Sequence, residues 1–319
     1  IAFARDEVRF RLDEKGRPIG VYTKVQKEAN QLIEEFMLLA NRRVAEYCAH
    51  RISNGRRVPR PMVFRVHDEP SEDKLERFRD FALRFGHYFK AQKGRAVAKE
   101  MNKLLTTIAG SAEQNAITTL AVRSMAKAVY TTDNIGHYGL AFPYYTHFTS
   151  PIRRYPDMMV HRLLQRYLDG GKSADADAYE ALCEHSSERE VVAAEAERAS
   201  IKYKMVEFMA DKVGEVFDGH ISGMSEWGIF VELENSIVEG MVAMRDIEGD
   251  YYRFDEARYE VYGHSTGNTF TLGDKVKVRV KSADLRRRML DFTFVEVDGE
   301  PIEEPTITFN DKVKKKRKK

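Results

Sequence analysis

The sequence predicts an α+β protein, with a mostly helical part at residues 1–212 followed by a small all-β barrel at 213–297. Up to about residue 212, apolar side chains recur every three or four positions in several stretches, as in amphipathic helices. From Val213 onward the period changes to two, and five short strands follow in about 80 residues. This pattern is typical of a small antiparallel barrel. With 319 residues, the chain is long enough for two domains.

The helical part begins with a predicted hairpin. Val8–Leu12 and Ile19–Tyr22 alternate as strands, and residues 14–17 form the turn between them. A helix is expected from about 28 to 52, because apolar residues there follow a period of 3.6, namely Leu32, Phe36, Leu39 and Val44.

Shorter elements follow before the next long helix. Residues 63–66 read as a strand, and Pro70-Ser71 opens a helix that carries Leu75, Phe78, Phe81 and Phe85. Ser111 and Gln114 have capping-box spacing, which predicts another helix start. Gly170-Gly171 interrupts the helical pattern, and residues 175–212 are predicted to form one long, alanine-rich helix.

The run from His147 to Arg162, HFTSPIRRYPDMMVHR, is the most informative segment of the helical part. Pro156 suits the first turn of a helix, so a helix should begin near that residue. Its free N–H groups would then point toward two hydroxyls and two arginines, which together suit a phosphodiester: Thr149, Ser150, Arg153 and Arg154. The alternative is a surface loop whose arginines pair with nearby acids.

In the barrel, the fourth strand places cations on one face and valines on the other. Val276, Val278 and Val280 alternate with Lys275, Lys277, Arg279 and Lys281. Such a face is usually just solvated, but aromatic residues accompany it here: Phe217, Trp227, Phe230, Tyr251, Tyr252 and Phe254. Cations beside exposed rings are how OB-type barrels hold single strands. Strict alternation would separate Trp227 from Phe230, and a bulge at Gly228 would bring them together.

Composition excludes several classes of protein. The chain is 43% apolar, with no apolar run near the ~18 residues that a membrane span needs, and we expect no secretory leader. Two cysteines, Cys48 and Cys183, are too few for a disulfide framework and fit a reducing cytoplasm. Because residue 1 is isoleucine rather than methionine, we expect a piece of a longer polypeptide.

The net charge of +2 hides an asymmetry. Residues 312–319 hold seven of the 52 basic residues and none of the 50 acidic ones, so the rest of the chain carries 45 basic against 50 acidic residues. Any RNA contact must therefore rest on local patches. We expect 298–319 to be a basic, disordered tail, with either a solubilising or a polyanion-binding role.

Residues 213 to about 295 resemble the S1 domain, an OB-fold RNA-binding module. The matching segments are VGEVFDGHI, WGIFVEL and EGMV, which follow one another in the module's order. The resemblance assigns base stacking to Trp227 and Phe230, and strand contacts to Asp284 and Arg288. Many S1 domains have a histidine where this chain has Ala243, so one contact is lost. Lys277 and Arg279 would lie near phosphates.

The run at 147–157 resembles the signature of RNB-family exoribonucleases, and NQLIEEFMLLAN at 30–41, FRVHDEP at 64–70, GHYGL at 136–140 and DYYRFD at 250–255 resemble the same family in the same order. The resemblance implies processive hydrolysis of single-stranded RNA from its 3′ end, by a two-magnesium mechanism that releases nucleoside 5′-monophosphates. We expect a cytoplasmic monomer that does not associate with membranes.

The resemblance also implies roles for individual residues. Arg153 would stabilise the charge that builds on the phosphate in the transition state, and Glu35 would orient the terminal nucleotide through ribose hydroxyls. For Glu35 the alternative is a helix carboxylate paired with a lysine. Phe3 aligns with an aromatic clamp for the last base. Further RNA contacts are expected from the signature run, at His147, Thr149, Ser150, Arg154 and Tyr155.

The family's magnesium ligands form an aspartate cluster, which we expect upstream of residue 1. Four acids gather near the helix start at Pro70, but there they complement the helix dipole and read as structural: Asp68, Glu69, Glu72 and Asp73. This chain alone should therefore bind RNA weakly and cut nothing. The alternative function is a non-catalytic RNA-binding protein that keeps the same scaffold as a clamp or regulator.

Overall fold

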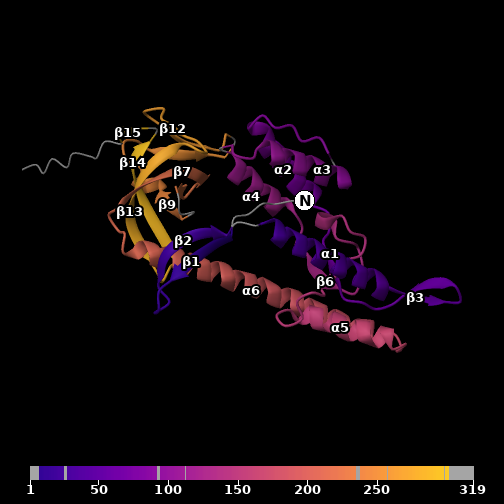
Figure 1. Ribbon diagram of the computed structural model, residues 1–319. Coiled ribbons are helices and arrows are strands. Elements are labelled where there is room, and N and C mark those ends of the chain that lie inside the picture. The colour runs from indigo at the N-terminus through magenta and orange to yellow at the C-terminus, as the bar shows by residue number, and fades with distance from the viewer. Residues whose placement is uncertain are drawn as a thin grey trace, which may run out of the picture. The chain divides into compact units, whose positions relative to one another are not determined.

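The computed structural model describes residues 7–24, 27–91, 94–111, 113–234, 238–256, 258–297 and 299–301. The chain forms two compact units, one from residues 1–9 and 23–201 and the other from residues 10–22 and 202–319 (Figure 1). Helices dominate the first unit and strands the second, which confirms the predicted α+β class. None of the helices in the described ranges is long and apolar enough to span a membrane.

The elements up to residue 210 are mostly helices, with short strands that pair in twos. In order they are β1 (Glu7–Leu12), β2 (Pro18–Lys24), α1 (Glu28–Cys48), β3 (His50–Ser53), β4 (Arg56–Pro59), β5 (Phe64–Val66), α2 (Glu72–Arg84), α3 (Arg95–Thr107), α4 (Gln114–Ser124), β6 (Val129–Thr131), the 3₁₀ turn η1 (Tyr138–Leu140), α5 (Tyr155–Leu168) and α6 (Ala176–Ala210). The predicted hairpin, the helix after Pro70 and the long final helix are confirmed.

The main core of the first unit lies around α5. One face of this helix is buried, at Met159, Val160, Leu163 and Tyr167, as its apolar spacing predicts. That face belongs to one cluster with β5, through Phe64 and Val66, and with α6, through Cys183. Burial raises the pKa of the Cys183 thiol to about 12, so this cysteine behaves as an inert apolar side chain. The core therefore fixes where α5 begins.

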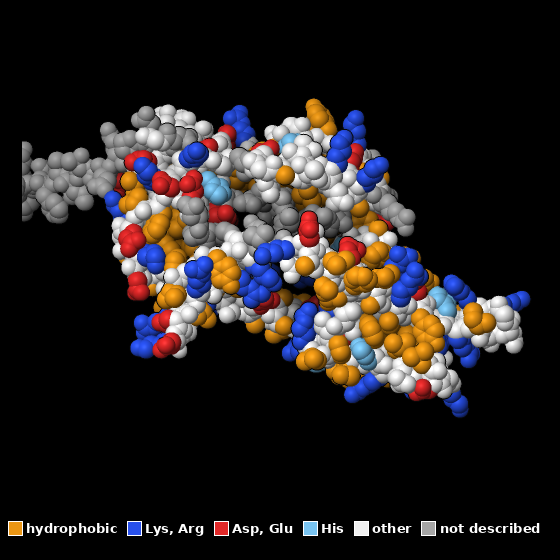
Figure 2. Space-filling view, in the orientation of Figure 1, with side chains coloured by type: hydrophobic (Ala, Val, Ile, Leu, Met, Phe, Trp, Pro, Cys, Tyr) orange, Lys and Arg blue, Asp and Glu red, His pale blue; other side chains and the backbone are white. Residues whose placement is uncertain are grey.

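Helix α1 departs from the prediction at its end and on its surface. It ends at Cys48 rather than near residue 52, because 50–53 pairs with β4 as a hairpin. Its apolar residues are also largely exposed: Leu32, Ile33, Phe36 and Leu39 keep 58%, 59%, 61% and 48% of their surface accessible. Figure 2 shows hydrophobic side chains gathered at the surface over α1 and α5. The 3.6-residue period correctly predicted a helix, but not the burial of this face.

The predicted capping box at Ser111 is wrong. The residue that caps α4 is Glu113, and the Ser111 hydroxyl donates to the carbonyl of Ile108 at 2.8 Å. The Gln114 side chain instead accepts from the N–H of Gly110 at 2.6 Å. The sequence pattern therefore located the helix within three residues but assigned its polar contacts wrongly. Helix α3, which packs with α2 against α4, was not predicted.

The second unit contains a closed ring of five strands: β7 (Val216–Ser225), β8 (Gly228–Leu233), β9 (Glu239–Ala243), β13 (Lys275–Asp284) and β14 (Met289–Val297). They follow the order β13-β7-β8-β9-β14, and β13 pairs again with β14 to close the barrel. Ile221, Ile229, Val278 and Phe292 are fully buried. The ring agrees with the expected OB fold. β14 also pairs with β15 (Glu300–Pro301).

A small sheet between β9 and β13 was not predicted as strands. It consists of β10 (Tyr252–Asp255), β11 (Glu260–Gly263) and β12 (Thr269–Phe270), and a 3₁₀ turn, η2 (Met244–Asp246), leads into it. Tyr252 and Phe270 pack edge to face, with their ring centroids 5.3 Å apart.

Candidate functional site

The loop before α5 confirms the predicted helix start to within one residue. Arg154 is the N-cap residue, α5 begins at Tyr155, and Pro156 lies in its first turn. The backbone N–H groups of Arg153 and Arg154 donate to the carbonyl of Ser150, at 3.3 and 3.0 Å, so the loop closes as a tight turn. The two arginines therefore lie directly against the N-terminus of α5.

The two arginines have different partners. Asp157 is fully buried, and its Oδ2 accepts from Arg154 Nη2 at 2.9 Å and from the backbone N–H of Ser150 at 2.7 Å. Arg153 is exposed, and its side chain forms no hydrogen bond or ion pair with the residues that the structure describes. The alternative of paired loop arginines thus holds for Arg154 alone. Arg154 fixes the loop, and Arg153 is left available for an external anion.

His147 lies behind this loop as a neutral imidazole. Burial is the main cause that lowers its pKa to about 3, and the nearby Arg154 adds to the effect. The hydroxyl of Tyr130 lies 2.7 Å from Nδ1, and burial raises the pKa of Tyr130 to about 12, so this phenol keeps its proton. When the phenol donates to Nδ1, the imidazole carries its own proton on Nε2. His147 can then act as a hydrogen-bond donor without carrying charge.

Tyr130 is held from two sides. Its backbone N–H donates to Ser187 Oγ of α6 at 2.9 Å, and the guanidinium of Arg65 lies 4.6 Å from the centroid of its ring. Arg65 forms a two-pronged ion pair with Glu190 of α6, at 2.6 and 2.9 Å. Such a fork fixes the guanidinium plane. Strands β5 and β6 and helix α6 thereby support His147.

Asn41 connects helix α1 to the loop. Its Oδ1 accepts from the N–H of Phe148 at 3.0 Å, and its Nδ2 donates to the hydroxyl of Tyr145 at 3.2 Å. Asn41 is almost fully buried, so both contacts are shielded from water. Sequence reasoning assigned no role to Asn41, Tyr130 or Tyr145. Asn41 meets the loop across more than 100 residues of chain, and its only signal was its place at the end of the family-like segment 30–41.

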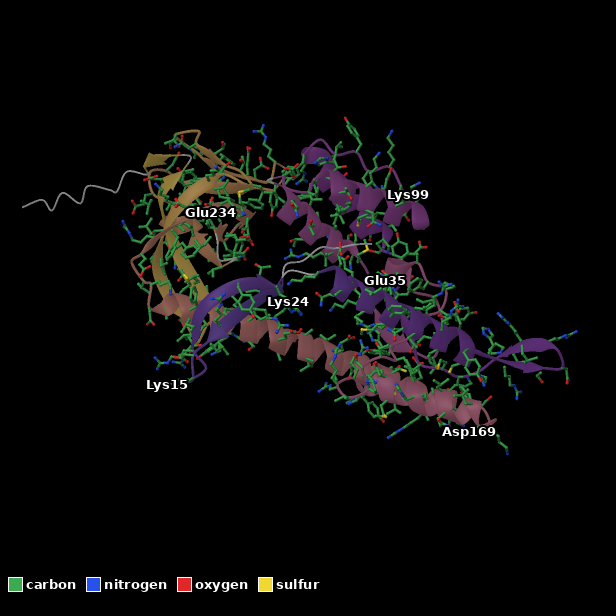
Figure 3. All side chains as sticks on the ribbon, in the orientation of Figure 1. Lys15, Lys24, Glu35, Lys99, Asp169 and Glu234 are labelled. Carbon is green, nitrogen blue, oxygen red and sulfur yellow. The ribbon has the colours of Figure 1, made fainter. Side chains whose placement is uncertain are left out.

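The remaining predicted residues of the first unit differ in exposure. Glu35 projects from α1 (Figure 3), is exposed, and pairs with no lysine in the described part of the chain. Tyr155 is 51% exposed. The hydroxyl of Thr149 is buried and has no partner among the described residues. Phe3 lies outside the described residues, as do residues 302–319 of the tail.

The described residues do not fit a magnesium site. Among them, no group of three or more acidic, histidine or cysteine side chains is placed to hold a metal ion. Asp157 is already engaged by Arg154, as described above. Near α2, Asp68 accepts from the N–H of Glu69 at 2.7 Å, and Glu69 accepts from the N–H of Gly94 at 3.2 Å. Both acids thus accept hydrogen bonds from backbone N–H groups, which agrees with their predicted structural role.

In the barrel, Trp227 and Phe230 are presented differently from the prediction. Trp227 lies in the turn before β8 and is 72% exposed, whereas Phe230 lies on β8 and is half-buried. The predicted bulge at Gly228 is wrong, because β8 pairs with β9 in regular register from that residue onward. Gly228 is needed for a different reason: an added Cβ would clash with the carbonyl oxygen of Val242. The only irregularity that the β7–β8 register shows among the described residues lies in β7, between Ile221 and Gly223.

The cationic face of β13 is confirmed but is partly neutralised. Val276, Val278 and Val280 are buried, and the alternating basic residues face outward. Lys277 pairs with Glu296 at 2.8 Å, which raises the pKa of the lysine, and Lys281 pairs with Asp246 at 2.9 Å. Arg279 is exposed and also has an interaction partner.

Asp284 ends β13, and Arg288 lies in the turn between β13 and β14. Asp284 accepts from the N–H of Arg287 at 2.9 Å, and its carboxylate lies 3.8 Å from the Arg287 guanidinium. Arg288 is exposed and has a positive φ of 57°. The turn thus brings these two residues into one short segment of the barrel.

Two family models match the chain. The RNB domain model covers residues 1–170, and the S1 RNA binding domain model covers residues 210–294. Ribonuclease R 1 of Lactococcus lactis is 38% identical over 301 residues, which span 92% of this chain and 36% of that protein. Ribonuclease R of Aquifex aeolicus is 38% identical over 300 residues, with 93% and 41% covered. The chain thus spans less than half the length of these relatives.

Solved structures share the fold. RNase R of Mycoplasma genitalium, both in its apo form and in complex with ribose methylated single-stranded RNA, superposes with a TM-score of 0.79 at 24% identity, over 92% of this chain and 46% of that one. Yeast Ssd1, described as a pseudonuclease, gives a TM-score of 0.61 at 24% identity, over 74% of this chain and 29% of its own. Because the RNB model matches more than half of the sequence, including the loop and α5, the chain belongs to the RNB family.

Proposed function

We propose that this chain is part of a 3′→5′ exoribonuclease that hydrolyses RNA processively and releases nucleoside 5′-monophosphates. The observation that carries the proposal is the contrast between the two arginines at the start of α5. Arg154 is fixed by the buried Asp157, and Arg153 is exposed beside it without a partner among the described residues. RNB-family membership and the name of the relatives, ribonuclease R, support the reaction class.

The loop can bind a phosphodiester through several donors. The N-terminus of α5 provides a positive dipole end, and the guanidinium of Arg153 provides a planar fork for two phosphate oxygens. His147 adds a neutral donor in the tautomer that Tyr130 favours. Attack on phosphorus places more negative charge on the nonbridging oxygens, so a cation that contacts these oxygens stabilises the transition state more than the ground state. In this proposal Arg153 has that role, and Arg154 is a positioning residue.

The substrate proposed is the 3′ end of a single-stranded RNA. Glu35 is an exposed acceptor for ribose hydroxyls, which would distinguish RNA from DNA. In the barrel, Trp227 and Phe230 would stack bases, and Lys277 and Arg279 would lie along the phosphates. The S1 model match and the RNA-bound state of the Mycoplasma protein support an RNA ligand.

A divalent metal is part of the proposal, but no step is assigned to it. RNB-family membership implies Mg²⁺, which would supply charge at the phosphate, and the described residues do not fit its site. That its ligands lie upstream of residue 1 stays a prediction. We also propose a cytoplasmic, monomeric protein. Burial raises the pKa of Cys48 to about 11, and both cysteines are free, as expected for a reducing compartment.

The second candidate is a non-catalytic RNA-binding protein. It is compatible with the S1 RNA binding domain match and with the fold shared with Ssd1, which is described as a pseudonuclease. Fold likeness alone does not choose between the two, because one fold serves several functions.

The test uses the full-length protein and a 3′-tailed RNA whose internal phosphates are labelled, so that the released nucleotides and the shortened chains can both be followed. With Mg²⁺ and RNA in excess, we expect nucleoside 5′-monophosphates and few intermediates, and chelation should stop the reaction. A 3′-blocked RNA and a DNA of the same sequence serve as controls. RNA that is bound but stays intact would support the non-catalytic candidate instead, and nucleoside 3′-phosphates would contradict the proposed chemistry.

A further inference from the structure

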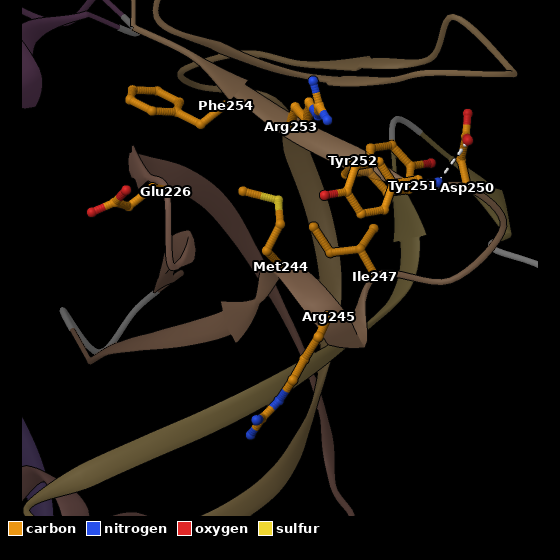
Figure 4. Close-up of a pocket in the computed structure, with 9 residues that line it drawn as sticks. All are labelled: Glu226, Met244, Arg245, Ile247, Asp250, Tyr251, Tyr252, Arg253 and Phe254. Carbon is orange, nitrogen blue, oxygen red and sulfur yellow. Dashed lines mark hydrogen bonds between the residues drawn. The ribbon is translucent and has the colours of Figure 1, made fainter.

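The second unit contains a pocket that the proposed function does not use. Its volume is about 560 Å³, and it is lined by Glu226 and by residues between 244 and 254 (Figure 4). Its walls come mainly from η2 and β10, not from the strand that carries Phe230. This size lies within the range of sites for small molecules and single nucleotides, roughly 300–1,000 Å³.

The backbone of Tyr251 is locked at one edge of the pocket, while its ring is left exposed. Its N–H donates to Asp250 at 2.6 Å, and its carbonyl accepts from the N–H of His264 at 3.0 Å. The ring is nevertheless 66% accessible to water. A rigid, exposed aromatic ring loses little entropy when a ligand stacks on it.

The carboxylate of Asp250 is already hydrogen-bonded within the protein. Its carboxylate also accepts from the N–H groups of Ser265 and Thr266, at 2.8 and 2.6 Å, and from the Thr266 hydroxyl at 2.8 Å. These bonds lower the pKa of Asp250. An acid satisfied in this way repels an approaching anion less than a free carboxylate would, because four donors already face it.

Two guanidinium groups at the pocket have no acidic partner among the described residues. Arg253 lies 5.3 Å from the centroid of the Tyr251 ring, and Arg245 extends from η2 on another side of the pocket (Figure 4). Both side chains are exposed, and neither forms an ion pair or hydrogen bond within the described ranges. An exposed cation beside an exposed ring suits a ligand that has both a planar face and a phosphate.

The floor between them is apolar. Ile247 and Tyr252 are buried, and Met244 and Phe254 are half-buried, so a flat heterocycle could cover largely apolar surface there. In Figure 4, Met244, Ile247 and Tyr252 lie in the middle of the view, with Phe254 and Glu226 toward one side and Tyr251 toward the other.

We propose that this pocket binds an unpaired nucleotide of an RNA single strand, with its base against Tyr251 and its phosphate on Arg253. The inference rests on the proposed RNA substrate. The N–H of Met244 donates to the carbonyl of Trp227 at 3.0 Å, and Glu226 also lines the pocket, so the turn that carries Trp227 borders it. In this proposal an RNA strand that stacks on Trp227 continues into the pocket. The barrel then binds one nucleotide more than it would through its β-strands alone.

The test measures RNA affinity of the full chain with a fluorescent single-stranded oligonucleotide. Tyr251→Ala is expected to weaken binding about 10-fold, from one lost stacking contact, and Tyr251→Phe to bind within about twofold of the parent. Arg253→Ala should weaken binding and lower the salt dependence by about one phosphate contact. The matched control is Tyr22→Ala, because Tyr22 is 44% exposed in the same unit and also has an arginine, Arg11, 5.8 Å from its ring centroid.

The readouts separate this inference from the proposed function. Trp227 is the only tryptophan, so its fluorescence reports the adjacent stacking site and the folding of the barrel in each variant. If Tyr251→Ala and Arg253→Ala bind like Tyr22→Ala while RNA still quenches Trp227, the pocket inference is overturned and the RNA substrate stands. If the parent chain neither binds RNA nor shows quenching, both fail. Should Tyr251→Ala not fold, Arg253→Ala decides the question alone.

Discussion

Replacing Arg154 with alanine should destabilise the first unit strongly, because the buried carboxylate of Asp157 then loses its cationic partner. Asp157 is fully buried, and its Oδ2 has two donors, the Arg154 guanidinium and the Ser150 N–H. Breaking a buried ion pair costs about 3–5 kcal/mol. The Arg154 side chain is 20% exposed and the Ser150 bond survives, so the lower end applies, about 3 kcal/mol. Arg153→Ala should cost at most about 0.5 kcal/mol, as for an exposed residue without such contacts.

Urea unfolding followed by two signals checks this prediction. Far-ultraviolet circular dichroism follows the helices, which lie mainly in the first unit, and Trp227 fluorescence follows the barrel. With a denaturant slope of about 2 kcal/mol per molar, Arg154→Ala should lower the helical midpoint by about 1.5 M and leave the Trp227 transition in place. Adding Asp157→Asn should recover part of the loss, because no buried charge then remains. Equal effects of Arg153→Ala and Arg154→Ala would refute the reasoning.

Three further predictions concern the barrel and the imidazole. Gly228→Ala should destabilise the barrel by about 1–3 kcal/mol in Trp227 fluorescence melts, since its Cβ meets a carbonyl of β9. Gly223→Ala should not, because its Cβ would make only an ordinary contact with Phe230 at 3.7 Å, and equal melting of the two variants would contradict this. The folded pKa of His147, about 3, lies below its ordinary value, so the unfolded chain takes up a proton first as the pH falls. Unfolding free energy should therefore drop by about 1–2 kcal/mol from pH 7 to pH 5 relative to His147→Gln, and an identical pH slope would refute the assignment. Trp227→Ala with Phe230→Ala should weaken RNA binding by about 1–3 kcal/mol per stacked base, and an unchanged dissociation constant would rule out stacking.

Local signals in the sequence predicted the elements well where the chemistry is local. Pro156 marks a helix start because its fixed φ and missing N–H suit only that position, and the period of two along Val276–Val280 follows from strand geometry. The signals failed where tertiary contacts compete. Helix α1 ends early because 50–53 pairs with β4, and Gly228 serves close packing rather than a bulge.

The candidate site was only partly predictable for the same reason. The signature run identified Arg153 and Arg154, but their different environments depend on Asp157, which the sequence showed only as an acid in a first helical turn. The support from Tyr130 and Asn41 comes from other elements of the fold, and no spacing rule links them to the loop. The pocket beside Tyr251 likewise forms only once η2 and β10 pack together.

The most direct test of the account compares chemistry with binding for Arg153→Ala in the full-length protein. Single-turnover cleavage of a 3′-tailed RNA and the dissociation constant for the same RNA would be measured side by side, with Arg153→Lys as the variant that keeps the charge. The account predicts a cleavage rate lower by about 10²–10³ for Arg153→Ala, as for other lost transition-state donors, with an almost unchanged dissociation constant. Cleavage and binding that fall in parallel, or cleavage that persists, would contradict it.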